Sequence, residues 1–264
     1  QGRGQRNAGD VGAADRVRCG KGAMKTIAVI QARMGSSRLP GKVLMPLGDS
    51  CVLDYVVSRT RTIGGVSDVV VATTTAARDD AIADWCSKQG VAFYRGSETN
   101  VLSRFLEAAE PYRPDAVIRV TADNPFFDYE TGSRCVEMAS EGGADLVVFE
   151  SGHPLGMAVE LVKYEVLKRI GRLATEPRHF EHVTYYAYEF PERFRIVRAP
   201  VPEELKHPEL RMTMDTGEDY RLMHAVASAF PGQKTVSTAE VVNYLLSHPE
   251  LVRLNCHIEQ KPVV

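Results

Sequence analysis

The sequence has no marked excess of charge of either sign. Its 264 residues include 32 Lys and Arg and 34 Asp and Glu, which leave a formal net charge of −2. A domain that binds nucleic acid needs a strongly basic face, so a nearly neutral chain argues against a nucleic-acid partner. The sequence also lacks any apolar run that approaches the about 18 residues of a membrane-spanning helix, and we expect no membrane partner.

Cysteine is scarce and scattered. The cysteines are odd in number and none stands in C-x-x-C spacing (Cys19, Cys51, Cys86, Cys135 and Cys256). This pattern argues against a disulfide framework or a zinc site and favours free thiols in a reducing compartment. We therefore predict a cytoplasmic protein.

Residues 1–23 contain almost no large apolar side chain. They are rich in Gly and Arg, lack the hydrophobic region of a signal peptide, and cannot bury enough surface to offset the entropy lost on ordering. We interpret them as a disordered extension, with Met24 as the natural start of the chain. Residues 24–250 are then expected to form a single domain and residues 251–264 a tail.

Buried strands and amphipathic helices alternate after Met24. Short apolar runs predict strands at 26–30, 68–73, 91–94, 115–121 and 145–149. Periodic segments predict helices at 52–63, 78–89, 101–110 and 128–140, capped in three cases by Ser50, Asn100 and Asp128. The alternation predicts an α/β fold with a mostly parallel, Rossmann-like sheet that helices cover on both faces.

The alternation loosens in the C-terminal half. We interpret residues from about 150 to 208 as an excursion that shapes an acceptor pocket or a subunit contact, with strands at 157–162 and 194–199 and helices at 163–172 and 178–189. A strand at 211–214 is then expected to return to the sheet. Helices follow at 218–230, capped by Thr216, and at 238–247.

A basic loop follows the first predicted strand. It carries Arg33, Arg38 and Lys42 together with Gly35 and Gly41. Ligands of open α/β sheets bind at the carboxyl ends of the strands, where this loop begins. Guanidinium and ammonium groups on a glycine-relieved backbone suit a polyphosphate, although local composition alone is equally consistent with an ordinary basic surface loop.

The same loop is not a Walker A motif, which requires G-x4-G-K-[ST]. Five residues separate Gly35 from Gly41, and Val43 stands where the magnesium-binding hydroxyl belongs. Two aspartates also follow predicted strands. Asp123 comes directly after the strand at 115–121, and Asp215 follows the one at 211–214, so both are expected to point into the crevice that the basic loop borders.

The stretch 30–44 (Ile-Gln-Ala-Arg-Met-Gly-Ser-Ser-Arg-Leu-Pro-Gly-Lys-Val-Leu) resembles the signature of the cytidylyltransferases that make CMP-activated acidic sugars. The similarity is greatest to the branch named for spore-coat polysaccharide biosynthesis protein F, related to acylneuraminate and CMP-Kdo synthetases. Further matches follow in order at 68–73, 95–98, 101–104, 119–125, 181–184 and 214–219.

The resemblance implies a nucleotide-diphospho-sugar transferase fold and a specific reaction. CTP and an acidic acceptor would give a CMP-acceptor and pyrophosphate, with Mg2+, in a cytoplasmic homodimer that serves cell-surface polysaccharide or related glycoconjugate synthesis. The acceptor would be a nonulosonic or other sugar acid, or a molecule that bears a phosphate or phosphonate.

The resemblance also assigns the nucleotide and metal residues. Arg33, Arg38 and Lys42 match the cations that bind the triphosphate, and Ser36 and Ser37 are placed to donate to its oxygens. Asp123 and Asp215 match the metal carboxylates, and Mg2+ commonly binds one or two carboxylates together with phosphate oxygens and water. The implied catalytic residues are Arg33, Lys42, Asp123 and Asp215.

Base and ribose recognition is implied for residues near the exits of the first two strands. Ala32, Arg33 and Thr73 are the candidates for the cytosine, and Ser97 and Arg104 for the ribose or base. For Thr73 and Ser97, an ordinary turn hydroxyl is an equally good interpretation.

The acceptor loop departs from the family pattern. The branch often carries Asp-Gly-x-Asp-Val-Glu, whereas residues 155–160 read Leu-Gly-Met-Ala-Val-Glu, so that only Glu160 matches an acidic position. Two fewer anions favour an anionic acceptor. The residues suspected of touching it are His153, Glu160, Arg178 and His182.

Nearby residues are assigned no site. His179 and His182 stand three apart without a third ligand, so no zinc site is predicted. Tyr185, Tyr186 and Tyr188 are expected in the core or at the dimer interface.

Two other functions were weighed against this one. A metal-dependent glycosyltransferase on a related fold needs a D-x-D motif, which Asp123-Asn124-Pro125 does not supply. A catalytically silent nucleotide-binding relative with a regulatory role fits the altered acceptor loop. The joint presence of Arg33, Lys42, Asp123 and Asp215 counts against that alternative.

Overall fold

The computed structural model describes residues 24–260. The expectations for residues 1–23 and for the last four residues of the tail lie outside this range. Within it, no helix is both long and apolar enough to cross a membrane.

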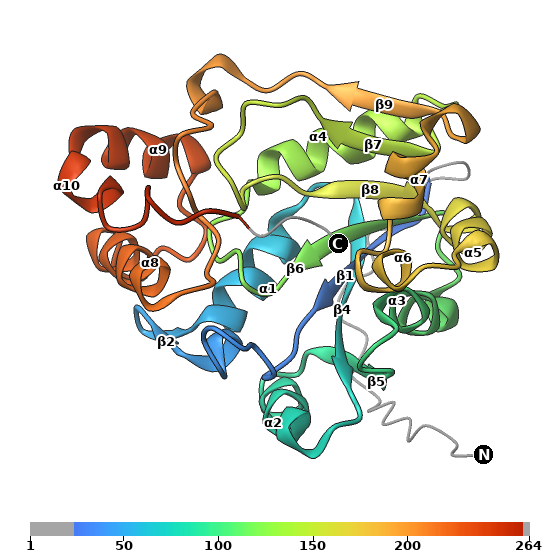
Figure 1. The fold of residues 1–264 in the computed structure, drawn as a ribbon, viewed down its shortest axis with the longest axis horizontal. Coiled ribbons are helices and arrows are strands. Elements are labelled where there is room, and N and C mark those ends of the chain that lie inside the picture. The colour runs from blue at the N-terminus through green and yellow to red at the C-terminus, as the bar shows by residue number, and fades with distance from the viewer. Residues whose placement is uncertain (1–23, 261–264) are drawn as a thin grey trace.

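A seven-stranded sheet forms the centre of the molecule (Figure 1). Its order is β5 (Ala92–Gly96), β4 (Val66–Thr74), β1 (Thr26–Gln31), β6 (Ala116–Thr121), β8 (Glu160–Lys163), β7 (Leu146–Phe149) and β9 (Ile196–Ala199). All neighbours run parallel except β8, which is antiparallel to both β6 and β7. A separate hairpin joins β2 (Pro46–Leu47) and β3 (Ser50–Cys51).

Helices lie on both sides of the sheet, as the alternation predicted. They are α1 (Val52–Thr62), α2 (Asp80–Lys88), α3 (Val101–Ala109), α4 (Tyr129–Ser140), α5 (Tyr164–Leu173), α6 (Pro177–Glu181), α7 (Tyr185–Glu189), α8 (Gly217–Ala229), α9 (Thr238–Ser247) and α10 (Pro249–Val252). Short 3₁₀ helices occur at Lys42–Leu44, Ala77–Asp79, Glu110–Tyr112, Pro191–Arg193 and Glu203–Leu205.

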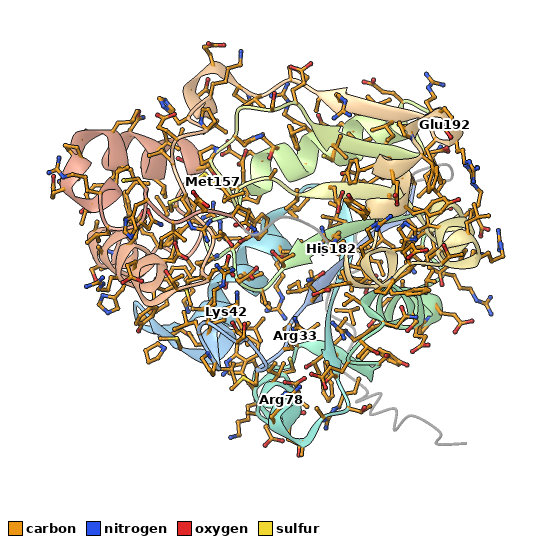
Figure 2. The ribbon with its side chains drawn as sticks, viewed as in Figure 1. Arg33, Lys42, Arg78, Met157, His182 and Glu192 are labelled. Carbon is orange, nitrogen blue, oxygen red and sulfur yellow. The ribbon has the colours of Figure 1, made fainter. Side chains whose placement is uncertain are left out.

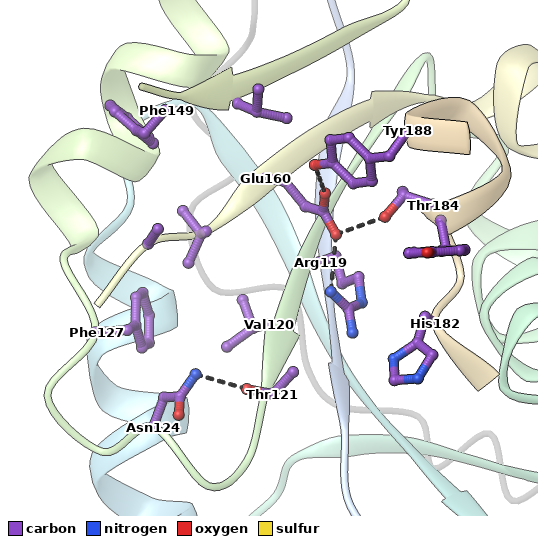
Figure 3. A pocket seen from close by; sticks show the side chains of 14 residues that line it. Arg119, Val120, Thr121, Asn124, Phe127, Phe149, Glu160, His182, Thr184 and Tyr188 are labelled. Carbon is purple, nitrogen blue, oxygen red and sulfur yellow. Dashed lines mark hydrogen bonds and ion pairs between the residues drawn. The ribbon is translucent and has the colours of Figure 1, made fainter. Parts of the chain in front are cut away.

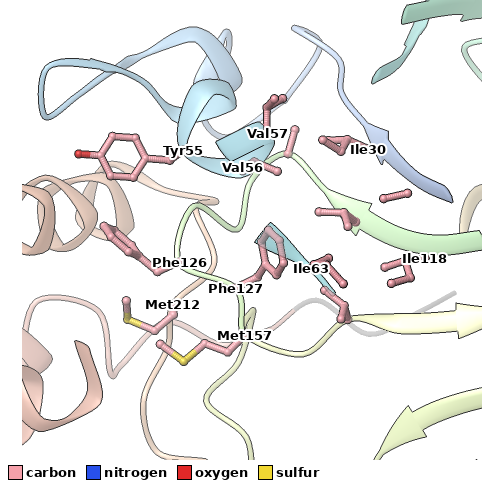
Figure 4. Packing of buried hydrophobic residues seen from close by; sticks show 14 of the residues in the cluster. Ile30, Tyr55, Val56, Val57, Ile63, Ile118, Phe126, Phe127, Met157 and Met212 are labelled. Atoms are coloured by element: carbon pink, nitrogen blue, oxygen red, sulfur yellow. The ribbon is translucent and has the colours of Figure 1, made fainter. Parts of the chain in front are cut away.

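Alternate residues along the strands point to opposite faces of the sheet and pack into two separate hydrophobic clusters. Ile30 and Ile118 pack with residues of α1, α4, α8 and α9, a cluster that Figure 4 shows around Tyr55 and Phe126. Ile27 and Val29 point to the opposite face and pack with α3 and α5. This two-residue period is what a strand buried on both faces produces.

Three of the predicted helix caps are confirmed. The side chains of Asn100, Asp128 and Thr216 accept hydrogen bonds from backbone N–H groups in the first turns of α3, α4 and α8. The cap predicted for Ser50 is wrong. Ser50 lies in β3 and donates its hydroxyl proton to Asp54, while Cys51 occupies the cap position without a side-chain bond.

The single helix predicted over residues 178–189 is wrong, because the chain breaks into α6 and α7. Val183 lies between them with a φ of 44°, an unfavourable value for a β-branched residue. Its side chain is fully buried, and the hydroxyl of the next residue, Thr184, donates to Glu160 at 2.7 Å. These tertiary contacts outweigh helix continuation and turn His182 and Thr184 toward the sheet.

The strand predicted over residues 211–214 is also wrong. The segment makes one isolated bridge, from Arg211 to Leu155, and joins no strand of the sheet. A backbone hydrogen bond joins its end to the turn after β6, where Met214 N–H donates to the carbonyl of Asp123 at 2.9 Å. That bond places Asp215 beside Asp123 without an intervening strand.

Arg59 on α1 is fully buried and hydrogen-bonds to two loops that are far apart in the sequence. Its guanidinium donates to the carbonyls of Phe127 (2.8 Å), Lys234 (3.2 Å) and Val236 (2.7 Å). Burial is the main reason that its pKa falls to about 10. The loop that follows β6 and carries Asp123 therefore depends on this one side chain.

We expect Arg59→Met to lower the free energy of unfolding by about 3 kcal/mol, since three buried carbonyls lose their donor. For a domain of this size that loss corresponds to a fall of about 6–12 °C in the melting temperature. Calorimetry checks the value, with exposed Arg61→Met on the same helix as the control. Equal melting temperatures for the two variants would contradict the role given to Arg59.

Candidate functional site

Lys42 lies between the two aspartates that the sequence predicted as metal ligands. Its Nζ is 2.7 Å from Asp123 Oδ2 and 3.0 Å from Asp215 Oδ1, and it donates to the carbonyl of Met214 at 2.7 Å. The preceding Gly41 has a φ of 73°, a left-handed value that favours glycine and turns the loop into the short helix of Lys42. The fold thus brings together residues that are 81 and 173 positions apart.

Asp215 is surrounded by cations. Besides Lys42, Arg38 Nη2 and Arg211 Nη2 each lie 3.0 Å from its Oδ2. Burial acts to raise the pKa of Asp215, but the charges of Lys42, Arg38 and Arg211 outweigh it, and the pKa lies below its ordinary value. The carboxylate is therefore ionised throughout the neutral range.

Stability should depend on the ionisation of Asp215 in acid. A lowered folded-state pKa means that the unfolded chain binds more protons, so this contribution is present above about pH 4 and lost as the pH falls through the folded pKa. We expect the free energy of unfolding to decline less steeply below about pH 4 in Asp215→Asn than in the wild type. Urea unfolding at a series of pH values measures this slope, and identical slopes would contradict the pairing.

Arg211 was not anticipated from the sequence. It is 5% exposed, and its Nε donates to Asp219 Oδ1 at 2.9 Å on the first turn of α8. Asp219 also closes the capping box with Thr216. Arg211 therefore links the cap of α8 to Asp215.

The tail beyond residue 250 reaches this cluster. Asn255 is fully buried, and its Nδ2 donates to the carbonyl of Arg211 and to Asp219 Oδ1, both at 2.9 Å. Gln260 Oε1 accepts from Arg211 Nη1 at 2.9 Å. The described part of the tail, through Gln260, thus packs against the cluster that holds Asp215.

We expect Asn255→Leu to lower the melting temperature by about 4–8 °C, because two buried hydrogen bonds worth about 2 kcal/mol are lost. Turnover should fall about tenfold, because Arg211 loses a restraint and a displacement of about 1 Å in a catalytic site is enough to lower the rate substantially. Exposed Asn243→Leu on α9 is the matched control. Wild-type turnover in Asn255→Leu would show that the tail does not position Arg211.

Asp79 fixes the near end of the basic loop. It is fully buried, accepts from Met34 N–H at 2.7 Å, and bonds the hydroxyl of Thr74 at the end of β4. At the other end, Gly41 N–H donates to the carbonyl of Met34 at 2.9 Å. No sequence motif marked Asp79, because its role arises only when β4 lies beside β1.

The other residues predicted to bind the nucleotide differ in their exposure and in their hydrogen-bond partners. Arg33, labelled in Figure 2, is exposed, and its Nη2 lies 3.8 Å from Glu181 Oε1. Ser36 Oγ accepts from Leu39 N–H at 3.3 Å, and Ser37 is exposed. Ala32 N–H donates to the carbonyl of Ala72 at 3.1 Å, which joins the exits of β1 and β4.

The residues predicted to bind the base or ribose from the second strand onward are less exposed than Arg33. They are Thr73, Ser97 and Arg104. Thr73 is fully buried, and its hydroxyl has no hydrogen-bond partner among the described residues. Ser97 Oγ accepts from Asn100 N–H at 3.0 Å, as an ordinary turn hydroxyl does. Arg104 is 1% exposed and donates to the carbonyl of Ser97, and burial lowers its pKa to about 10.

The oxygen atoms around Lys42 are of the kind that bind a hard divalent cation. Asp123 and Asp215 contribute carboxylate oxygens beside the Met214 carbonyl, and Mg2+ prefers such oxygen ligands. Asp123 Oδ1 makes no hydrogen bond to any described residue. Over the same residues there is no group of three or more His, Cys, Asp or Glu side chains suited to a metal. Mg2+ commonly takes one or two carboxylates from a protein and completes its shell with phosphate oxygens and water.

A pocket of about 360 Å³ lies at the carboxyl end of β6, where Thr121 and Asn124 line it (Figure 3). One side is polar and includes Arg119, Glu160, His182, Thr184 and Tyr188. The other side is apolar and includes Phe127, Val148, Phe149, Ala158 and Val159. Such a mixture of apolar walls and a few convergent polar groups is typical of a small-molecule site.

Of the four residues predicted to touch the acceptor, two line the pocket and two do not. Glu160 and His182 line the pocket. Arg178 lies outside the lining, where its Nη2 pairs with Glu189 at 2.7 Å. His153 also lies outside it, stacked edge-on against Phe149 at a centroid distance of 4.9 Å.

A model of the cytidylyltransferase family matches residues 27–248. The chain is 37% identical to spore coat polysaccharide biosynthesis protein SpsF of Bacillus subtilis, over 84% of this chain and 94% of that protein. It is 27% identical to 3-deoxy-manno-octulosonate cytidylyltransferase of Escherichia coli, over 84% of this chain and 96% of that protein.

The fold has a close counterpart among solved structures. A cytidylyltransferase from Leptospira borgpetersenii superposes with a TM-score of 0.82 and 30% identity, over 90% of this chain and all of that one. These matches agree with the family that the opening signature indicated and with the mostly parallel sheet. The chain belongs to the cytidylyltransferase family, whose members are CTP-dependent nucleotidyltransferases.

Proposed function

We propose that the protein transfers CMP from CTP to an acidic acceptor and releases pyrophosphate, as a step in the synthesis of a cell-surface polysaccharide or related glycoconjugate. The observation that carries this proposal is the position of Lys42, within 3.0 Å of both Asp123 and Asp215 at the end of the basic loop. Cations and carboxylates converge there beside a pocket of acceptor size.

Transfer of a nucleotidyl group is an in-line displacement at the α-phosphate, in which catalysis comes from positioning and charge neutralisation. Arg33, Arg38 and Lys42 would neutralise the triphosphate, held by a loop that Asp79 and the Met34 carbonyl restrain. Asp123 and Asp215 would hold Mg2+, which when bound polarises the phosphate oxygens. Arg211 keeps Asp215 oriented in the absence of nucleotide.

Pyrophosphate release tests the proposal. The protein with Mg2+ is supplied with each of the four nucleoside triphosphates and with sugar acids, polyol phosphates or aminoalkylphosphonates. We expect release with CTP alone, and only when an acidic acceptor is present. Failure of every acceptor, together with no CTP binding by calorimetry, would refute the proposal.

The homodimer is a second element of the proposal and is supported by the resemblance alone. Light scattering after gel filtration measures the mass directly. A mass near twice the 29.1 kDa of the chain is the expected result, and a monomer at working concentrations would contradict it.

A further inference from the structure

The pocket at the carboxyl end of β6 contains a cation whose hydrogen-bonding capacity is largely unused. We propose that Arg119 binds an oxyanion of the acceptor, and that the pocket selects molecules in which a carboxylate, phosphate or phosphonate adjoins an apolar portion. The inference rests on the proposed cytidylyltransferase reaction and narrows its acceptor. Arg119 was not among the residues that the sequence assigned to the acceptor.

Arg119 has more donors than the protein satisfies. Its Nη1 donates to Glu160 Oε1 at 2.8 Å, while its Nε is buried without a partner among the described residues. A guanidinium has five N–H donors in a planar fork that matches the geometry of a carboxylate or a phosphate. In Figure 3 the guanidinium lies between Glu160 and His182 and faces the open part of the pocket.

Glu160, in contrast, has its carboxylate oxygens engaged. Oε1 accepts from Thr184 Oγ1 at 2.7 Å as well as from Arg119, and Oε2 accepts from the Tyr188 hydroxyl at 2.5 Å. Burial raises the pKa of Tyr188 above its ordinary value, so the hydroxyl keeps its proton and donates. Glu160 therefore orients Arg119, and the unused capacity of the pair is that of the cation.

The other polar groups of the pocket carry no competing charge. Arg119 and Glu160 are the only Lys, Arg, Asp or Glu side chains in its lining. Burial, and to a lesser extent the charge of Arg119, lowers the pKa of His182, which is therefore a neutral imidazole near pH 7. An anion that enters the pocket therefore meets a cation with free N–H donors. The carboxylate of Glu160 repels it less strongly, because both of its oxygens already accept hydrogen bonds.

The opposite wall is apolar, and the polar side chains at its edge are Asn124 and Thr121, which bond to each other at 2.8 Å (Figure 3). It consists of the side chains of Phe127, Val148, Phe149, Ala158 and Val159. A heavily hydroxylated ligand would leave its hydroxyls without partners against this wall, whereas a deoxygenated or acylated portion would bury apolar surface.

Arg119 is also suitably placed for transfer. It pairs with Glu160 across β6 and β8, and β6 ends at Thr121, two residues before Asp123. At about 3.3 Å per residue, the Cα of Arg119 lies roughly 7 Å from that of Thr121. An acceptor held at Arg119 therefore lies within the length of a small molecule from Asp123 and Lys42.

Titration calorimetry with simple anions tests the proposal independently of turnover. The basic loop is first filled with Mg2+ and a non-hydrolysable CTP analogue, so that Arg33, Arg38 and Lys42 do not compete for the probe. Methylphosphonate, propylphosphonate, butyrate and neutral 1-butanol are then titrated. We expect both phosphonates to bind, with about fourfold tighter binding for each added methylene, and 1-butanol to bind at least tenfold more weakly than propylphosphonate.

Two variants and a control locate the site. Arg119→Gln should weaken propylphosphonate binding at least tenfold, and Arg119→Lys, which keeps the pair with Glu160 but loses the fork, should have an intermediate effect. Exposed Arg172→Gln on α5 should bind as the wild type does. Circular dichroism melts and the affinity for the CTP analogue verify that each variant is folded.

The outcomes separate this inference from the proposed function. Unchanged anion binding in folded Arg119→Gln, or equal binding of 1-butanol and propylphosphonate by the wild type, would overturn the inference while leaving CMP transfer intact. No anion binding by the wild type at millimolar probe would overturn it too. If the CTP analogue fails to bind, the proposed function fails, and the same titration without the analogue still decides the role of Arg119. The preference between butyrate and propylphosphonate identifies the acidic group.

Discussion

Lys42→Met is expected to reduce kcat/KM for CTP by about 100- to 1000-fold, the range found when one preorganised donor is removed from a transition state. Lys42 is 8% exposed and bridges Asp123 and Asp215. Methionine preserves the length of the side chain but removes the charge. The expected defect therefore comes from lost neutralisation of the triphosphate and from repulsion between two unbridged carboxylates.

Single-turnover pyrophosphate release and CTP calorimetry measure this effect. If Lys42 only bridges the carboxylates, its replacement should leave CTP affinity unchanged. If it binds the triphosphate, its replacement should lower both the affinity and the rate. Lys88→Met at an exposed position of α2 is the matched control, since it makes the same substitution away from the loop. Activity within tenfold of the wild type in Lys42→Met would contradict the assignment.

Asp123→Asn and Asp215→Ala are each expected to abolish measurable turnover, with different effects on stability. Among the described residues, the side chain of Asp123 contacts only Lys42, so its replacement should leave the melting temperature nearly unchanged. Asp215 pairs with three cations, Lys42, Arg38 and Arg211. Its removal takes one carboxylate partner from each of these partly buried cations, which we expect to cost about 2 kcal/mol, or about 4–8 °C in melting temperature.

Activity and melting curves on the same preparations separate the two roles. If Asp123 serves as a metal ligand, Asp123→Asn should weaken Mg2+ binding in calorimetry while its melting curve stays close to that of the wild type. Exposed Asp84→Asn on α2 is the control. Either site variant with activity within tenfold of the wild type would refute the metal assignment for that residue.

Several site features were open to prediction because they depend on neighbours in the chain. The strand that ends at Gln31 and the basic loop after it are local patterns, and so is the acidic residue that follows β6. Their meeting follows from a general property of parallel sheets, whose strands end on one edge. That reasoning was correct for Asp123. For Asp215 the reason was wrong, because residues 211–214 form an isolated bridge to Leu155 and hydrogen bonds to loops.

The acceptor side was harder to predict, because its key contacts cross the sheet. Arg119 lies in a strand whose apolar neighbours concealed its role, and it becomes recognisable only when the antiparallel β8 places Glu160 opposite it. The break between α6 and α7 is similar. Helical periodicity favoured one continuous helix, but burial of Val183 and the bond from Thr184 to Glu160 outweighed it.

The sequence by itself determined the α/β alternation, three of the helix caps, the basic loop and membership in the cytidylyltransferase family, because each is encoded in local spacing and composition. Only the tertiary structure decided that Lys42 bridges Asp123 and Asp215, that Asn255 of the tail secures Arg211, and that Arg119 faces the pocket. These features depend on side chains far apart in the chain, and their hydrogen-bond partners exist only once the sheet order and the loop packing have been established.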